Sequence, residues 1–141
     1  MLTLFFINCG LVVTVVTIHY WILFRLAKLI PAINVKDHVK IIVGVLGGLI
    51  AHTIEVWIFG LAYYFMHGVE EFGGLAGNFD GTLLDCGYFS FSTYTTSGYG
   101  DIYPEGGLRY TAGIESLAGL VLITWTASFL FLEMQRHWKE R

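Results

Sequence analysis

Three long stretches of apolar residues, at 4–24, 41–65 and 108–132, take up most of this 141-residue chain. The first contains no Asp, Glu, Lys or Arg, and each is as long as the roughly 20 residues that a helix needs to cross about 30 Å of hydrocarbon. The chain is 55% hydrophobic and only 13% charged, outside the usual range of soluble globular domains. The sequence therefore predicts an all-α membrane protein with three transmembrane helices.

The first stretch is interpreted as a retained transmembrane helix at residues 1–30. It has no basic segment before its apolar run, and it is longer than the apolar core of about 7–15 residues that a cleaved signal peptide usually has.

Charged residues indicate the orientation of the chain. Basic residues gather around the connection 31–40 and in the tail 136–141: Arg25, Lys28, Lys36 and Lys40, then Arg136, Lys139 and Arg141. The segment 66–107 has acidic residues and no Lys or Arg. Because basic segments stay in the cytoplasm, we expect the connection and the C-terminus to be cytoplasmic. The segment 66–107 and the N-terminus should lie outside the plasma membrane. Pro31 is expected to end the first helix and begin a polar hinge.

The segment between the second and third apolar stretches contains a shorter helix signal. Residues 66–81 are rich in glycine and are expected to form an irregular outer loop. Residues 82–94 are apolar but too short to span, and Thr82 with Asp85 forms a variant of the capping box. We therefore expect a re-entrant half-helix, whose irregular return is tolerated only where protein or a water-filled cavity shields it.

A polar stretch, TYTTSGYGD at residues 93–101, follows this half-helix. Gly98 and Gly100 lie two residues apart, and glycine readily adopts positive φ. Alternating such residues with ordinary ones turns successive carbonyl groups to the same side. Carbonyl oxygens that face inward from several chains can replace the hydration shell of a cation.

The stretch resembles the potassium-channel signature Thr-x-x-Thr-x-Gly-Tyr-Gly-Asp, and the resemblance covers residues 41–135 in a two-helix pore-domain arrangement. It implies an outer helix at 41–65, a pore helix at 82–94, a selectivity filter at 95–101 and an inner helix at 108–135. It also implies a homotetramer, with K⁺ as the permeating ion and no cofactor. The K⁺-binding residues would be Thr96, Ser97, Gly98, Tyr99 and Gly100, supported by Ser92, Thr93, Thr95 and Asp101. The negative end of the half-helix would face a central cavity.

The chain departs from that family's pattern in three ways. Ser97 replaces the usual Val or Ile and brings a hydroxyl group behind the filter, which puts selectivity in question. Tyr88 and Phe89 stand where relatives often have paired tryptophans, so another group must brace the Tyr99 ring, because Phe cannot donate a hydrogen bond. Ser92 stands where some relatives have a Glu.

The third apolar stretch contains candidate gating residues. Gly119 falls near the glycine that relatives use as a hinge, and Gly113 is a second candidate, although glycine also serves close helix packing in membranes. Phe131 is a candidate constriction near the inner mouth, or it packs against lipid or the second span.

Ionisable residues within the apolar stretches are functional candidates by default. His52 and Glu55 lie three residues apart and could bond each other, and Glu115 lies in the third span. Two interpretations stay open: a proton-sensitive link between the outer and inner helices, or hydrogen bonds that are only structural. A metal enzyme built from His19, His52, His67 and His137 is not favoured, since no second ligand pair lies on another span.

The sequence thus predicts a potassium-selective channel that is not an enzyme and binds no nucleic acid, since the net charge of −3 is small. Membrane lipid surrounds it, and an unidentified regulatory subunit is a possible partner. The alternatives are a poorly selective monovalent cation channel, with Ser97 as the reason, and a non-conducting subunit that uses the fold for assembly.

Overall fold

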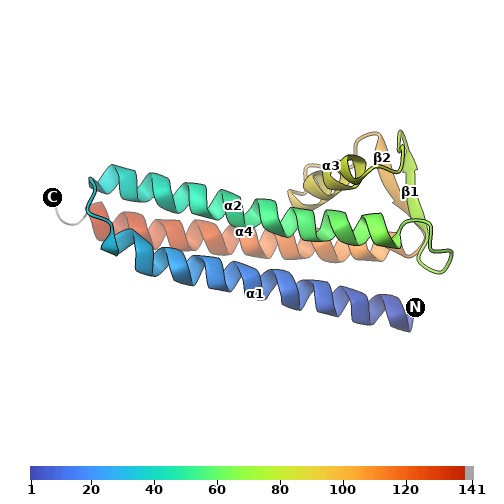
Figure 1. Cartoon of the computed structure of the whole chain (residues 1–141), viewed down its shortest axis with the longest axis horizontal. Helices are drawn as coiled ribbons and strands as arrows, with labels where there is room; N and C mark the ends of the chain where they lie inside the picture. Colours follow the sequence, from blue (N-terminus) through green and yellow to red (C-terminus); the bar gives the residue numbers. More distant parts are fainter. Residues whose placement is uncertain (139–141) are drawn as a thin grey trace.

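The computed structural model describes residues 1–138 and is mainly helical (Figure 1). Four helices form: α1 (Leu2–Ala32), α2 (Asp37–Met66), α3 (Leu83–Tyr94) and α4 (Leu108–Trp138). Two short strands, β1 (Gly74–Gly77) and β2 (Ile102–Glu105), lie in the connections before and after α3. Helices α1, α2 and α4 are each long and apolar enough to cross a membrane. The expected fold class is confirmed in these parts, and the last part of the expected tail, 139–141, lies outside the described residues.

The three long helices lie side by side, and α3 sits at one end of them beside the two strands (Figure 1). Helix α1 contacts both α2 and α4, and α3 packs between α2 and α4. The shared core includes Val15 of α1, Phe59 of α2, Phe89 of α3 and Leu122 of α4, which are all buried. The N-terminus lies at the end that carries the strands, and the C-terminus at the opposite end. The first helix is therefore packed onto the other three.

Pro31 does not end the first helix, contrary to expectation. It lies inside α1, which ends one residue later at Ala32. Proline cannot donate a backbone hydrogen bond to the residue four positions before it. In the last turn of a helix this loss affects few bonds, because the helix ends soon afterwards. Helix α2 then begins at Asp37. The connection is consequently four residues long, 33–36, instead of the expected ten.

The outer loop is also more ordered than the glycine-rich sequence suggested. Strands β1 and β2 pair antiparallel, with Gly77 opposite Ile102 and Gly74 opposite Glu105. Gly77 has a φ of 96°, and a Cβ atom at this position would overlap the Asp101 carbonyl oxygen. Glycine here therefore permits close strand pairing as well as a turn. This small sheet joins the end of the polar loop 95–101 to the outer loop.

Candidate functional site

Helix α3 determines where the polar loop 95–101 lies. Its N-terminus carries the predicted capping box: Thr82 Oγ1 accepts from the Asp85 N–H at 3.1 Å, and Asp85 Oδ2 accepts from the Thr82 N–H at 3.3 Å. Its last residue, Tyr94, contacts Gly119, the twelfth residue of α4. At about 1.5 Å per residue, this contact is roughly 16 Å along α4 from its start. The C-terminus of α3 therefore lies at membrane depth, and the chain returns from there.

The start of the loop is bonded to the last turn of α3. The Ser97 N–H donates to the Ser92 carbonyl and the Thr96 N–H to the Thr93 carbonyl, both at 3.1 Å. The Ser116 hydroxyl of α4 donates to the same Thr93 carbonyl at 3.1 Å. Ser92 and Thr93 thus contact the loop and α4 through their backbone carbonyl groups.

Two alternating residues of the loop have a positive φ, but only one of them, Gly98, is one of the two expected glycines. Thr96 has a φ of 55° and Gly98 a φ of 100°, whereas Gly100 has no positive φ. A non-glycine residue in this region costs on the order of 1–3 kcal/mol and persists only where the surroundings impose it. At Thr96 the bonds to the end of α3 supply that constraint. Gly100 is needed for space instead, because a Cβ there would lie 2.5 Å from the Tyr88 hydroxyl oxygen.

The carbonyl oxygens of residues 96–100 accept no hydrogen bond from any part of the chain that the structure describes. Residues 95–101 are also exposed in the single chain. Backbone carbonyl groups without partners are costly away from water. In a loop at membrane depth, water, an ion or another chain must satisfy such groups.

The Ser97 hydroxyl is not left without partners behind the loop. Ser97 Oγ donates to the Ser92 carbonyl at 3.3 Å and lies 3.2 Å from Thr95 Oγ1. The Thr95 hydroxyl also lies 2.7 Å from the Phe91 carbonyl oxygen. Ser97 is therefore hydrogen-bonded to the end of α3, where relatives of the resembled family pack an apolar side chain.

Stacking braces the Tyr99 ring. The rings of Tyr99 and Phe89 are 5.6 Å apart at an interplanar angle of 22°. Phe89 in turn meets the edge of the Tyr63 ring, with centroids 4.9 Å apart. The Tyr99 ring therefore stacks on the ring of Phe89, which is buried in the core, and this contact takes the place of a hydrogen-bond donor.

Hydrogen bonds hold the outer end of the loop. Asn78 Nδ2 donates to Asp101 Oδ2 at 3.0 Å, and the Asn78 N–H donates to the Asp101 carbonyl at 2.9 Å. The bond from the Asn78 side chain, with a smaller contribution from Tyr88, lowers the pKa of Asp101 below its ordinary value. Asp101 therefore stays ionised at the mouth of the loop over the neutral pH range.

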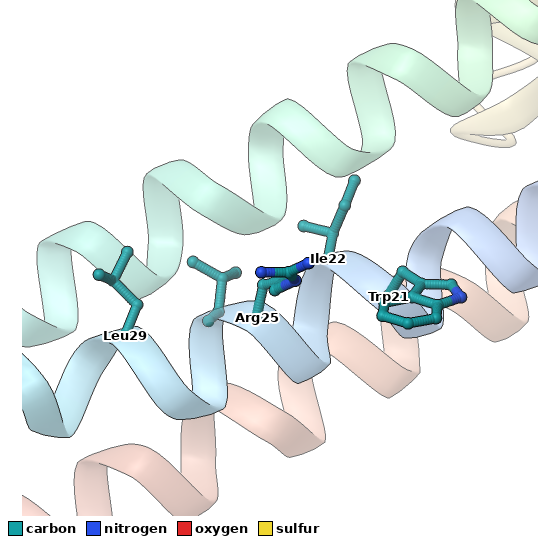
Figure 2. Close-up of a pocket in the computed structure, with 5 residues that line it drawn as sticks. Trp21, Ile22, Arg25 and Leu29 are labelled. Atoms are coloured by element: carbon teal, nitrogen blue, oxygen red, sulfur yellow. The ribbon is translucent and has the colours of Figure 1, made fainter.

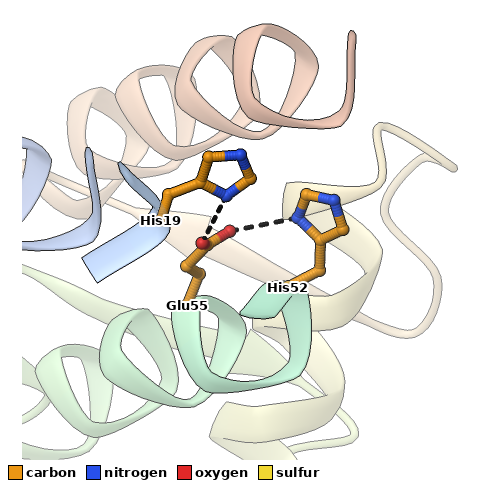
Figure 3. Close-up of side chains that lie close together, drawn as sticks. All are labelled: His19, His52 and Glu55. Atoms are coloured by element: carbon orange, nitrogen blue, oxygen red, sulfur yellow. Dashed lines mark hydrogen bonds and ion pairs between the residues drawn. The ribbon is translucent and has the colours of Figure 1, made fainter. Parts of the chain in front are cut away.

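His52 and Glu55 bond each other, as their spacing suggested, but they belong to a larger cluster. His52 Nδ1 lies 3.1 Å from Glu55 Oε2, and His19 Nδ1 lies 2.8 Å from Glu55 Oε1 (Figure 3). The Tyr94 hydroxyl donates to Glu55 Oε2, and Thr126 Oγ1 contacts both histidine rings. All four helices contribute to this cluster. The sequence did not predict the roles of His19 and Tyr94, although a histidine in a charge-free span was a signal for the first.

Glu115 lies in a separate cluster. Tyr63 donates its hydroxyl to Glu115 Oε2 at 2.5 Å, and Ser90 Oγ lies 2.5 Å from Glu115 Oε1 and 2.7 Å from the Val56 carbonyl oxygen. Ser90 has one hydroxyl proton for two acceptors. If that proton is donated to Val56, the Glu115 carboxyl group must itself donate to Ser90, which fits a neutral side chain. The partners of Glu115 are on α2 and α3.

The candidate gating residues have different surroundings. A Cβ at Gly119 would overlap the Tyr94 carbonyl oxygen, whereas a Cβ at Gly113 would meet nothing within 4 Å. Phe131 is 58% exposed in the single chain. Gly119 therefore has a packing reason to be glycine, and the roles of these residues in gating stay predictions.

A shallow hollow follows the C-terminal half of α1 (Figure 2). Its lining combines aromatic, aliphatic and basic side chains: Trp21, Ile22, Arg25, Leu26 and Leu29. The Arg25 guanidinium lies 5.9 Å from the Trp21 ring centroid, and Lys28 Nζ lies 4.1 Å from the Phe24 ring centroid. Aromatic and basic residues together are typical of helix segments at a membrane interface.

Comparison with known proteins gives one finding. A family model described as an ion channel matches residues 51–136, which is more than half of the chain. No curated protein and no solved structure matches the chain. The matched segment begins next to His52 and includes α3, the polar loop and most of α4.

Proposed function

This chain belongs to the ion-channel family, and from that membership we propose that it conducts K⁺ passively and selectively across the plasma membrane. The ion-binding groups are the backbone carbonyls of residues 96–100, with the Thr96 hydroxyl as the innermost ligand. The protein acts as a transporter of ions and not as an enzyme, and K⁺ is its only ion in this role.

The observation that carries the proposal is that the carbonyl groups of the loop lack hydrogen-bond partners. Those of residues 96–100 have no hydrogen-bond partner in the described chain, and left-handed conformations occur at two alternating positions, Thr96 and Gly98. Such carbonyls can replace the water molecules around a cation. The polar motif at 93–101, which resembles the potassium-channel signature, supports K⁺ as that cation.

A homotetramer would complete this site. One loop supplies ligands on one side of an ion only, and residues 95–101 are exposed in the single chain. Four copies around one axis would surround the ion and shield the loops from lipid. Exposed apolar side chains on α4, among them Leu117, Leu120 and Val121, would then face neighbouring copies or lipid.

Two further features favour a cation. The C-terminal end of α3, at membrane depth, carries the negative end of the helix dipole. Asp101 adds a negative charge at the outer mouth, where the hydrogen bond from Asn78 keeps its pKa low.

The orientation follows from charge. The end of the molecule with the polar loop and the N-terminus would be outside the cell, and the basic connection and the C-terminus would be cytoplasmic. Arg25 and Lys28 near the hollow on α1 would then lie at the inner membrane surface, where anionic lipid gathers.

Selectivity distinguishes the proposal from two alternatives. A poorly selective monovalent cation channel remains the second candidate because Ser97 departs from the pattern of the resembled family. A non-conducting subunit that uses the fold for assembly is the third. An unidentified regulatory subunit would explain gating in any of these.

Flux into liposomes that contain the purified protein separates these possibilities. Uptake of K⁺ well above Na⁺ supports the proposal, equal uptake supports a poorly selective channel, and no uptake by folded protein supports an assembly subunit. Gly98→Asp should abolish selective flux, because a side chain at a φ of 100° strains the loop and adds a charge. Gly10→Ala in α1, outside the segment that the family model matches, is the control, since its Cβ meets nothing within 4 Å in the single chain.

A further inference from the structure

The cluster around Glu55 brings together three side chains of the kinds that bind transition metals. His19 comes from α1, and His52 and Glu55 come from α2. One potential ligand atom from each lies within 4.8 Å of the other two. We propose that His19, His52 and Glu55 bind a divalent transition-metal ion of the Zn²⁺ class between α1 and α2.

The distances suit such an ion. Zn²⁺ binds histidine nitrogen and carboxylate oxygen at about 2.0–2.2 Å, so neighbouring ligand atoms in a tetrahedral site are roughly 3.3 Å apart. The two Nδ1 atoms lie 2.8 and 3.1 Å from the Glu55 oxygens. Each histidine faces its own carboxylate oxygen, and one potential ligand atom from each of the three residues lies within 4.8 Å of the other two, so the three side chains are close enough to move onto one ion.

A fourth residue already orients both rings. Thr126 Oγ1 lies 3.3 Å from His19 Nε2 and 3.0 Å from His52 Nε2. Both Nδ1 atoms consequently point to the same carboxylate (Figure 3). Histidines that bind metals characteristically use their second ring nitrogen for a hydrogen bond of this kind.

With two neutral histidines and an ionised Glu55, hydrogen-bond counting leaves at least one contact of the cluster without a proton. Two neutral imidazoles carry one ring proton each. With these protons on the Nδ1 atoms, two Nε2 lone pairs face Thr126, which has one hydroxyl proton. With the protons on the Nε2 atoms, Thr126 can accept both, but two Nδ1 lone pairs then face the Glu55 carboxylate. A metal ion bound by the Nδ1 atoms and the carboxylate satisfies these contacts in the second arrangement. One added proton between His52 Nδ1 and Glu55 Oε2 does so in the mixed arrangement, with ring protons on His19 Nδ1 and His52 Nε2, and the test below separates the two.

The position of the site also suits an ion that enters after folding. His19 and Glu55 are fully buried, whereas the His52 side chain is 17% exposed, so the His52 side offers the entry. The Tyr94 hydroxyl lies 3.0 Å from His52 Nδ1 and bonds Glu55. Because Tyr94 directly precedes the polar loop, a bound ion would join α1 to the base of that loop.

The test is calorimetric titration of the purified full chain in detergent with ZnCl₂, after treatment with a chelator that is then removed. We expect one site per chain. Co²⁺ should bind at the same site and give the visible absorption bands of low-coordinate Co²⁺ with nitrogen ligands. Neither measurement depends on conduction, so the outcome is independent of the proposed function.

Variants assign the ligands. His19→Asn and His52→Asn should each remove the Zn²⁺ site and the Co²⁺ bands, whereas His38→Asn, at an exposed histidine of the same α2, should change neither. Thr126→Val keeps all three ligands and should weaken Zn²⁺ binding by about 10–100-fold. This variant keeps the test decisive if a histidine variant does not fold.

Two results would overturn the proposal. One is the absence of Zn²⁺ heat and Co²⁺ bands in folded wild-type protein, which would assign the unsatisfied contact to an added proton. The other is equal Zn²⁺ affinity in wild type, Thr126→Val and the folded histidine variants.

Discussion

Replacing Gly119 by alanine should destabilise the protein, whereas the same change at Gly113, in the same helix, should not. A Cβ at Gly119 would overlap the Tyr94 carbonyl oxygen and lie 3.0 Å from its carbonyl carbon and 3.1 Å from Cγ of the ring. These positions are tighter than an ordinary van der Waals contact, so α4 and the end of α3 must separate. At Gly113, nothing in the same chain lies within 4 Å.

The magnitude follows from two opposing contributions. Alanine in place of glycine favours a helix by about 1 kcal/mol at either position. Overpacking typically costs about 1–3 kcal/mol, and it applies only to Gly119→Ala. We therefore expect the free energies of unfolding of the two variants to differ by about 1–3 kcal/mol, with Gly113→Ala the more stable.

Reversible unfolding in detergent, with K⁺ and Na⁺ flux into liposomes as a second measurement, checks this prediction. Because Tyr94 directly precedes the polar loop, Gly119→Ala should also lower the ratio of K⁺ to Na⁺ uptake, and Gly113→Ala should leave it unchanged. Equal stability of the two variants would refute the packing argument. If only the Gly119→Ala flux then changed, a hinge at Gly119 would be the better explanation.

Four further predictions concern the loop and the buried carboxyl group. Ser97→Val should cost about 0.5–1.5 kcal/mol of stability through the lost hydrogen bonds, and an unchanged K⁺ to Na⁺ uptake ratio would show that Ser97 does not limit selectivity. Phe89→Leu should lower that ratio, because Tyr99 loses the ring against which it stacks; Tyr64→Leu, at an exposed aromatic residue, is its control. Glu115→Gln should retain nearly wild-type stability and the wild-type flux response from pH 5 to 8. Glu115→Ala should lose at least about 1–3 kcal/mol of stability, because the buried Tyr63 hydroxyl loses its acceptor. An equal loss of stability in Glu115→Gln would mean that an ionised carboxylate is required. The pKa of Asp101 is lowered from 3.8, so its contacts stabilise the fold above pH 3.8, and this stabilisation is lost as the pH falls through the lowered pKa. Asp101→Asn should therefore make the free energy of unfolding depend less on pH on the acid side. Parallel pH dependences of wild type and Asp101→Asn would contradict this.

The sequence was sufficient to predict the helices of this protein because each depends on local chemistry. Uninterrupted apolar stretches of sufficient length predict membrane-spanning helices wherever they occur. The Thr82 and Asp85 pair predicts a helix start because its hydrogen bonds lie within four residues. The motif at 93–101 predicted a non-helical loop after the half-helix, because glycine at 98 and 100 permits backbone conformations that a helix does not use.

Some local predictions still failed where neighbouring segments intervene. The strand at Gly74–Gly77 forms because β2 supplies its partner, and glycine permits their close approach. Gly100 is glycine because of Tyr88, which lies twelve residues earlier in the sequence, and not because of its own φ.

Only the tertiary structure determined which polar side chains meet inside the membrane. His19 and Glu55 are 36 residues apart and Tyr94 and Glu55 are 39 apart, yet they share one cluster, while Glu115 bonds elsewhere. Spacing within a helix shows which residues share a face, but it does not show which faces of different helices pack together or at what depth. That choice depends on the complementary packing of α1, α2, α3 and α4, which no single stretch of sequence contains.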